Sequence, residues 1–238
     1  MTDLIANLRS NSTLRVSLKY RTGLALHHLL AAGRSAARVK TIEDANRDQP
    51  YGPFWDEILQ NSIVVATLTV ASLEAYANDL WFENTFLKDK LSNEACQKIS
   101  ELVEKNDILG KFDLVLAIST GKKLNYGIEP VQSVNVLNAL RNALVHFRPE
   151  WSDEQDKHKK VADKLAGKFK VSPFLEKNEP IFPRAWASKD FSRWALKVTV
   201  DFLDHFCAEA KMKNPFESFL SQLEQLSEGV FSIKPSNN

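Results

Sequence analysis

The sequence predicts an all-α protein. Its 238 residues include only eight glycines and nine prolines, so few positions interrupt regular structure. Apolar residues recur every three or four positions over several long stretches, which is typical of helices with one buried side. Hydrophobic residues make up 44% and charged residues 26%, a balance that favours a globular domain with a substantial core. We therefore expect one domain over residues 1–238, an up-and-down antiparallel helical bundle.

Charge and cysteine content exclude some classes of protein. The formal net charge is +1, so any RNA contact must come from a local basic patch rather than from an overall basic excess. Cys96 and Cys207 have no paired spacing and the first residues lack a signal-peptide pattern, which together predict a cytoplasmic location. The uncharged run Ile58–Leu73 is shorter than the roughly 20 apolar residues of a membrane span, so we interpret it as a buried helix.

The first part of the chain predicts two long helices. An additional N-terminal helix is expected from about residue 14 to residue 40, and a polar loop follows to Pro53. The second helix runs from about residue 54 to residue 86 and is apolar on all sides in its middle, as a central helix would be. Glu74 is the only charge there, and a buried carboxylate needs a partner, for which Arg141 is the first candidate. Alternatively, Glu74 reaches solvent at the edge of the bundle.

Three shorter helices follow. Ser92 is a predicted cap for a helix over about 93–105, and the next helix spans about 107–119. The run after Ser119 is not a phosphate-binding loop, because Leu116 stands where the first glycine would be. The third helix begins after Pro130 and ends before Pro149.

The helix after Pro130 has an unusual distribution of residues. At about 100° per residue, its predicted core side consists of Val136, Leu140, Ala143, Leu144 and Phe147. Asn138, Asn142 and His146 fall on the other side, and Arg141 is the only fixed charge from 131 to 147. A helix side in open water normally carries lysines and glutamates, so we expect a second surface or a cleft to cover this one.

The hexapeptide Arg141-Asn142-Ala143-Leu144-Val145-His146 resembles the R-x4-6-H signature of HEPN domains, which are helical bundles found in many prokaryotic ribonuclease toxins and defence proteins. The upstream stretch ASLEAYANDLWF (Ala71–Phe82) is similar to the HEPN subgroup linked to RNA-ligase and phage-defence loci. The resemblance covers about residues 55–210, with a core over about 55–147 and 190–212. The chain departs from one toxin type at Arg148, where that type has a tyrosine, so regulation through the tyrosine does not carry over.

The resemblance implies a metal-independent endoribonuclease of a toxin or phage-defence kind that cleaves single-stranded RNA by attack of the 2′-OH. His146 would transfer protons because imidazole titrates near neutral pH, and Arg141 would stabilise charge on the phosphate. Asn142 lies four residues before His146 and would orient its ring. Glu74 and Asn138 would support the site. A homodimer is expected, and a neutralising protein partner fits the toxin class.

The segment 150–189 is a predicted, partly helical insertion before the last long helix, which is expected over about 190–212. A helix over about 153–169 has acids near its start and lysines further on, which suits the helix dipole. Its lysines and the preceding arginine are candidate RNA contacts, and a solvated helix side is the alternative. These candidates are Arg148, Lys157, Lys159, Lys160 and Lys164.

Two other functions remain open. One is a non-catalytic HEPN-like module that binds RNA or protein, with Arg141 and His146 at the interface. In the other, Arg141 only pairs with Glu74 and His146 is a hydrogen-bonded residue at a helix C-terminus. No HExxH motif, cysteine pair or compact carboxylate set occurs near His146, so we expect no metal and no cofactor.

Overall fold

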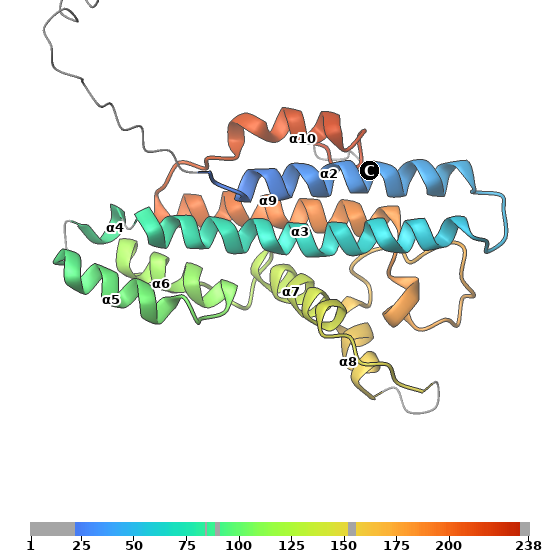
Figure 1. The fold of residues 1–238 in the computed structure, drawn as a ribbon, viewed down its shortest axis with the longest axis horizontal. Coiled ribbons are helices and arrows are strands. Elements are labelled where there is room, and N and C mark those ends of the chain that lie inside the picture. Colours follow the sequence, from blue (N-terminus) through green and yellow to red (C-terminus); the bar gives the residue numbers. More distant parts are fainter. Residues whose placement is uncertain (1–21, 84, 89–90, 152–155, 234–238) are drawn as a thin grey trace, which may run out of the picture.

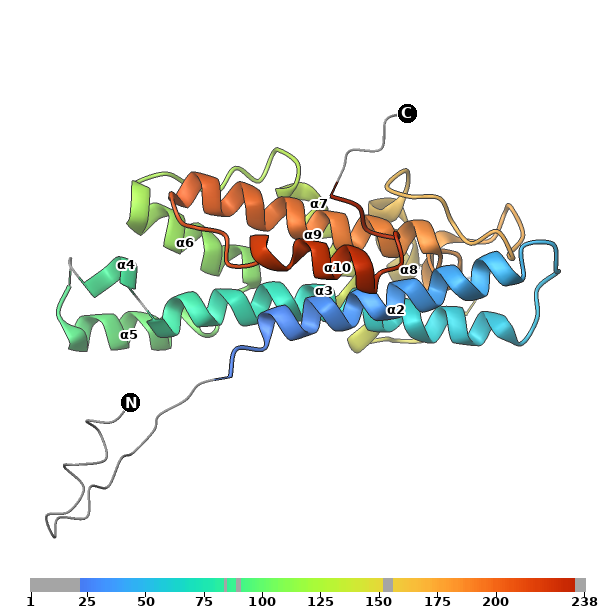
Figure 2. The same ribbon diagram turned by 90° about the horizontal axis from the view of Figure 1, so that it is seen from above.

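The computed structural model describes residues 22–83, 85–88, 91–151 and 156–233. These described residues are largely helical and contain no strand, which confirms the all-α prediction. Three long helices, α2 (Ala25–Ala45), α3 (Phe54–Glu83) and α9 (Lys189–Ala210), lie side by side along the molecule (Figures 1 and 2). The helix α10 (Leu220–Leu226) packs on α2, whereas α6 and α7 pack on the other side of α3 and α9 (Figure 1).

The N-terminal helix differs from its prediction at both ends. Residues 22–24 are not helical and α2 begins at Ala25, while the predicted segment 14–21 lies outside the described residues. Gly23 favours this non-helical stretch before α2, because glycine is about 1 kcal/mol less favourable than alanine inside a helix. At the other end α2 continues to Ala45, into the predicted loop, where the Asn46 side chain donates a hydrogen bond to the Ile42 carbonyl.

The helix α3 occupies the centre of the bundle, as its sequence predicts. Ile58, Leu73 and Ala77 are fully buried, because α2 and α9 pack along the helix. By length and composition alone, α3 is also apolar enough to cross a membrane, which the shorter uncharged run did not suggest. Core helices of globular proteins meet the same criterion.

Shorter helices lie at the C-terminal end of α3. They are α4 (Thr85–Lys88), α5 (Asn93–Val103) and α6 (Ile108–Thr120). The predicted cap of α5 is confirmed, since Ser92 Oγ accepts a hydrogen bond from the Ala95 N–H at 3.3 Å. Asp107 caps α6 in the same way by accepting from the Gly110 N–H at 2.8 Å. These side chains satisfy backbone donors that have no partner within the first helical turn.

The helix α7 (Val131–Val145) buries a different side from the predicted one. Its buried apolar residues are Val131, Val134, Leu137 and Leu140, so only Leu140 belongs to the predicted stripe. Phe147, predicted to be core, is 47% exposed. The prediction was wrong for two physical reasons. The helix ends before Phe147, so the 100° spacing of helical residues does not apply to this side chain. In addition, α7 packs against both α3 and α9, and these contacts decide which side of it is buried.

In its described residues, the insertion contains the helix α8 (Asp156–Leu165) and an irregular turn at Ile181–Ala185. The predicted helix over 153–169 is therefore too long at its C-terminal end, where Gly167 adopts a positive φ of 74°; residues 152–155 lie outside the described part. After the turn, Ser188 caps α9, and the predicted core residues Phe191, Phe202 and Phe206 are fully buried. A short turn at Glu217–Phe219 precedes α10.

A charged cluster joins the end of α2 to the start of α9. The carboxylate of Glu43, which is 6% exposed, accepts a hydrogen bond from the Lys189 backbone N–H at 2.8 Å. The Lys189 ammonium lies 3.5 Å from the Glu43 carboxylate and 2.7 Å from that of Asp44. Burial raises the pKa of Glu43, whereas the hydrogen bond from Lys189 lowers the pKa of Asp44 to about 2. Lys189 is thus the main cation that compensates the buried carboxylate of Glu43.

Candidate functional site

His146 lies at the C-terminal end of α7. It is the C-cap residue of α7, which agrees with the alternative of a residue at a helix C-terminus and not with a position inside the helix. Its backbone N–H donates to the Asn142 carbonyl at 3.0 Å. The side chain is exposed. Its position therefore depends on where α7 ends, and the imidazole is accessible to a ligand.

Arg141 lies on the side of α7 that faces α3. Its guanidinium donates a hydrogen bond to Glu74 Oε2 at 3.1 Å, so the predicted contact between these residues is present. The Arg141 side chain is 20% exposed and that of Glu74 is 45% exposed. The pair therefore lies at the edge of the bundle, and one side of the guanidinium is engaged by a carboxylate.

Arg141 is not among the described lining residues of the pocket that His146 lines. This pocket is a cavity of about 320 Å³ between the end of α7 and α8. We call this cavity the α7–α8 pocket. Its described lining residues are Ala143, His146, Phe147, Arg148, Lys157, His158, Val161 and Phe182.

The α7–α8 pocket is built around His158. This residue is 5% exposed, and its Nε2–H donates to the Arg148 carbonyl at 3.0 Å, which fixes the segment that follows α7. Glu150 Oε2 accepts hydrogen bonds from the backbone N–H groups of Lys157 and His158, at 3.1 and 3.0 Å. Glu150 thus satisfies the first turn of α8 and holds that helix beside the end of α7.

The candidate RNA contacts divide into two groups. Arg148 and Lys157 are exposed and line the α7–α8 pocket beside His146. Lys159, Lys160 and Lys164 are also exposed on α8 but do not line it. The pocket therefore takes two of the five predicted cations, and the other three lie on a solvated helix surface.

The two asparagines of the predicted site have different surroundings. Asn142, the residue that follows Arg141, is exposed. Asn138 is half-buried, and its Oδ1 is buried without a hydrogen-bond partner among the described residues. A buried acceptor without a donor costs free energy, so this oxygen is a weak point in the packing of α7.

Sequence reasoning missed the role of His158. A signal was present, since His158, Val161 and Leu165 have the spacing of one helix side and interrupt a run of lysines. Phe182 was missed because it comes from a distant part of the chain, and its ring meets the His158 ring edge-on with centroids 5.1 Å apart.

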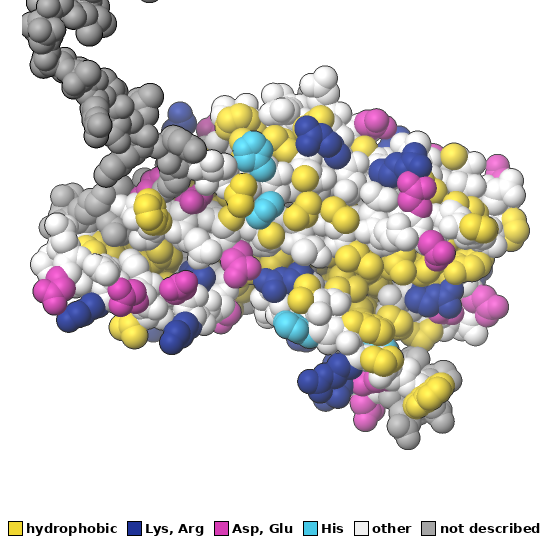
Figure 3. Space-filling model, viewed as in Figure 1, with side chains coloured by type: hydrophobic (Ala, Val, Ile, Leu, Met, Phe, Trp, Pro, Cys, Tyr) yellow, Lys and Arg dark blue, Asp and Glu magenta, His cyan; other side chains and the backbone are white. Residues whose placement is uncertain are grey.

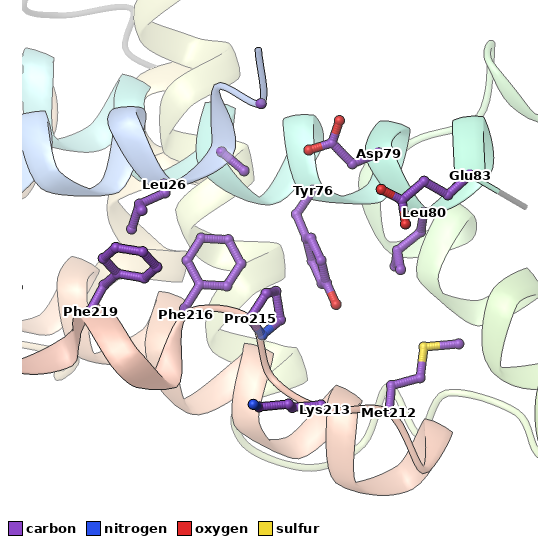
Figure 4. Close-up of a pocket in the computed structure, with 12 residues that line it drawn as sticks. Leu26, Tyr76, Asp79, Leu80, Glu83, Met212, Lys213, Pro215, Phe216 and Phe219 are labelled. Atoms are coloured by element: carbon purple, nitrogen blue, oxygen red, sulfur yellow. The ribbon is translucent and has the colours of Figure 1, made fainter. Parts of the chain in front are cut away.

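A second cavity, of about 380 Å³, lies on the α10 side of the molecule (Figure 4). Its walls are largely apolar and aromatic, with Tyr76 and Phe216 facing each other edge-on at 5.3 Å. Burial and the neighbouring Cys207 raise the pKa of the Tyr76 hydroxyl. This cavity contains none of the predicted site residues. Across the described part of the chain, no group of three or more His, Cys, Asp or Glu side chains is placed to hold a metal ion.

Comparisons with protein-family models, with curated proteins and with solved structures find no match for this chain. The function proposed below therefore depends on the residues of the site itself.

Proposed function

We propose that this protein is a metal-independent endoribonuclease of the HEPN type, with His146 and Arg141 as its catalytic residues. The observation that supports this best is the exposed imidazole of His146 beside a pocket whose described polar lining residues are all basic or histidine. Such a pocket favours an anionic group such as a phosphodiester. The HEPN-like arrangement of the helices is part of the proposal.

The proposed reaction uses the nucleophile of the substrate. The ribose 2′ oxygen attacks the adjacent phosphorus, and the P–O5′ bond breaks as the O2′–P bond forms. His146 either takes the proton from the 2′-OH as a general base or gives one to the 5′ oxygen as a general acid, and solvent water supplies or accepts the other proton. Arg141 stabilises the negative charge that builds up on the phosphate oxygens, and Asn142 orients the imidazole.

A two-fold homodimer is part of this proposal, because Arg141 is not among the described residues that line the pocket of His146, and a second copy could supply it. The outward side of α3 from Gln60 to Ala75 carries Glu74 as its one charged residue, and Val64 on it is 38% exposed. Figure 3 shows hydrophobic side chains gathered between α3 and the α7–α8 region. A two-fold contact over this surface would place the Arg141 of one copy near the His146 of the other.

The dimer leads to a specific prediction. We expect the wild-type protein to sediment as a dimer at micromolar concentration and Val64→Glu to sediment as a monomer, because the new carboxylate would be buried without a partner. Leu102→Glu is the control, since Leu102 is 74% exposed on α5, away from this surface. A wild-type monomer, or a dimer that survives Val64→Glu, contradicts the model.

The class of reaction is tested by its products. We expect cleavage of single-stranded RNA to persist in EDTA, to leave 2′,3′-cyclic phosphate and 5′-OH ends, and to fail on DNA and on RNA with 2′-O-methyl groups. Each result follows from attack by the 2′ oxygen. Mass spectrometry of the fragments identifies the ends. Dependence on Mg²⁺, or equal cleavage of DNA, overturns the proposed mechanism.

A second candidate function is a non-catalytic module that binds RNA or a protein partner. The contact between Arg141 and Glu74 favours it, because a phosphate must compete with a carboxylate for the guanidinium. The first function includes two further proposals. They are a neutralising protein partner and a cytoplasmic role as a toxin or phage-defence protein.

Arg141→Ala distinguishes these candidates. Under the proposed function it abolishes RNA cleavage and lowers stability by no more than about 1 kcal/mol, because the lost ion pair is half-exposed at Glu74. Thermal melting and a cleavage assay on the same preparation measure both effects. Unfolding of the variant instead assigns Arg141 a structural role, and unchanged cleavage removes it from the mechanism.

A further inference from the structure

The α7–α8 pocket has a positive lining. Arg148 and Lys157 line it, together with the imidazoles of His146 and His158, and no acidic residue is among its described lining residues. Glu150 lies nearby, but its carboxylate is directed to two backbone N–H groups of α8, and its Oε2 is 4.0 Å from His158 Nδ1. Among the described residues no ion pair engages Arg148 or Lys157, so their positive charge favours an anionic group in this pocket.

The same pocket contains an aromatic platform. The Phe147 ring stacks on the His158 ring, with centroids 5.4 Å apart and planes at 24°. His158 is held in turn by the Arg148 carbonyl and by the edge-on ring of Phe182. Phe147 is thus supported by a fixed ring while 47% of the residue stays exposed. An exposed aromatic side chain on a rigid support suits a flat π-system that stacks on it.

An anionic group and a flat ring in one small cavity define the ligand chemistry. The volume of about 320 Å³ is at the lower end of the range for small-molecule sites, which fits a single residue of a polymer rather than several. An acidic peptide would use the two cations but leave the Phe147 ring without a partner. A nucleotide uses both, with its phosphate on the cations and its base on the ring.

We propose that the α7–α8 pocket binds one unpaired nucleotide of a single-stranded RNA, with the base stacked on Phe147 and the phosphate held by Arg148 and Lys157. This assignment rests on the proposed function for its choice of RNA as the polymer. Because His146 lines the same pocket, the bound nucleotide adjoins the bond that is cleaved. A base in a duplex is already stacked and cannot enter, so the pocket selects single strands.

The experiment measures binding separately from cleavage. A fluorescein-labelled 2′-O-methyl RNA decamer, which cannot react, is titrated into the full-length protein and followed by fluorescence anisotropy. The variants are Phe147→Leu, Arg148→Gln and Lys157→Gln. Lys164→Gln is the matched control, because it removes one exposed charge from α8 without touching the pocket.

We expect Phe147→Leu to weaken binding by about 5- to 100-fold, the range for loss of one stacked base. Arg148→Gln and Lys157→Gln should each lower the slope of log affinity against log salt by about 1, as expected when one phosphate contact is lost. Lys164→Gln should bind as the wild type. Arg148→Gln keeps the test valid if Phe147→Leu fails to fold, since the backbone carbonyl of Arg148 holds His158 and its side chain makes no hydrogen bond or ion pair among the described residues.

Three outcomes overturn the inference: no binding of the decamer by the wild type, equal loss in Lys164→Gln, or full competition by an acidic decapeptide. The cleavage assay separates the two proposals. If the pocket variants lose binding but the wild type never cleaves unmodified RNA, the nucleotide site stands and the endoribonuclease does not. If the wild type cleaves and the pocket variants bind and cleave as it does, the endoribonuclease stands and the nucleotide site does not.

Discussion

His146→Ala is expected to lower the rate of RNA cleavage by about 10²- to 10⁴-fold, the usual contribution of a general acid or base. The variant should melt within a few degrees of the wild type, because the side chain is exposed at the end of α7 and the helix-ending hydrogen bond is made by the backbone N–H. Single-turnover cleavage at saturating protein measures the chemical step without the contribution of binding.

The matched control for this variant is His27→Ala. His27 is also an exposed histidine, but it lies on α2, which does not contribute to the α7–α8 pocket. Its cleavage rate should equal that of the wild type. Cleavage by His146→Ala at the wild-type rate would show that another group moves the proton, and a collapse of its melting temperature would assign His146 a structural role.

Lys189→Met is expected to destabilise the protein strongly, because Lys189 compensates the buried carboxylate of Glu43. The substitution leaves the Glu43 carboxylate, 6% exposed, with the Lys189 backbone N–H as its remaining donor in this cluster. Removing one partner of a buried pair costs about 3 kcal/mol, which for a chain of this size lowers the melting temperature by roughly 6 to 12 °C. Calorimetry at pH 7 measures the shift.

Two further variants check the cause of this loss. Lys197→Met removes another lysine of α9 whose ion pair with Asp201 is largely exposed, so it should change stability by less than about 1 kcal/mol. Glu43→Gln in the Lys189→Met background should restore part of the stability, because the buried charge is gone. A Lys189→Met protein as stable as the wild type would mean that Glu43 needs no cation.

The pH dependence has a definite sign. Burial holds the pKa of Glu43 above its usual value, and contacts from Lys189 partly oppose this rise. Without the Lys189 ammonium the pKa of Glu43 should rise further, so acidification stabilises the folded Lys189→Met protein more than the wild type. In the wild type, the pKa of Asp44 is about 2 instead of 3.8, so its contribution is present above about 4 and is lost as the pH falls through about 2. The stability difference between the two proteins should therefore shrink on mild acidification.

The features that the sequence predicted well are local ones. The Ser92 cap depends on a side chain three residues from its donor, and the central position of α3 follows from apolar residues on all of its sides. The contact between Glu74 and Arg141 was predictable for a related reason, since each is the only fixed charge in a long uncharged run.

The features that it missed depend on distant parts of the chain. Periodicity alone cannot tell which side of α7 is covered, because several sides carry apolar residues and the choice is made by α3 and α9. The α7–α8 pocket likewise needs Phe182, which reaches His158 only after the chain has turned at Ile181–Ala185. Homodimer formation and catalysis stay predictions.

The hydrogen bond between Glu43 and Lys189 spans 146 residues of sequence, and this has a consequence for synthesis on the ribosome. At about 5 to 20 residues per second, roughly 7 to 30 s pass between the emergence of α2 and that of the first turn of α9. During this interval α2 and α3 can already form their antiparallel hairpin, but the apolar surface that α9 later covers remains open, and the Glu43 carboxylate has no ammonium beside it. The chain therefore needs protection from aggregation while α2 and α3 form this hairpin. Once α9 has been synthesised, it covers the apolar surface and Lys189 can bind Glu43.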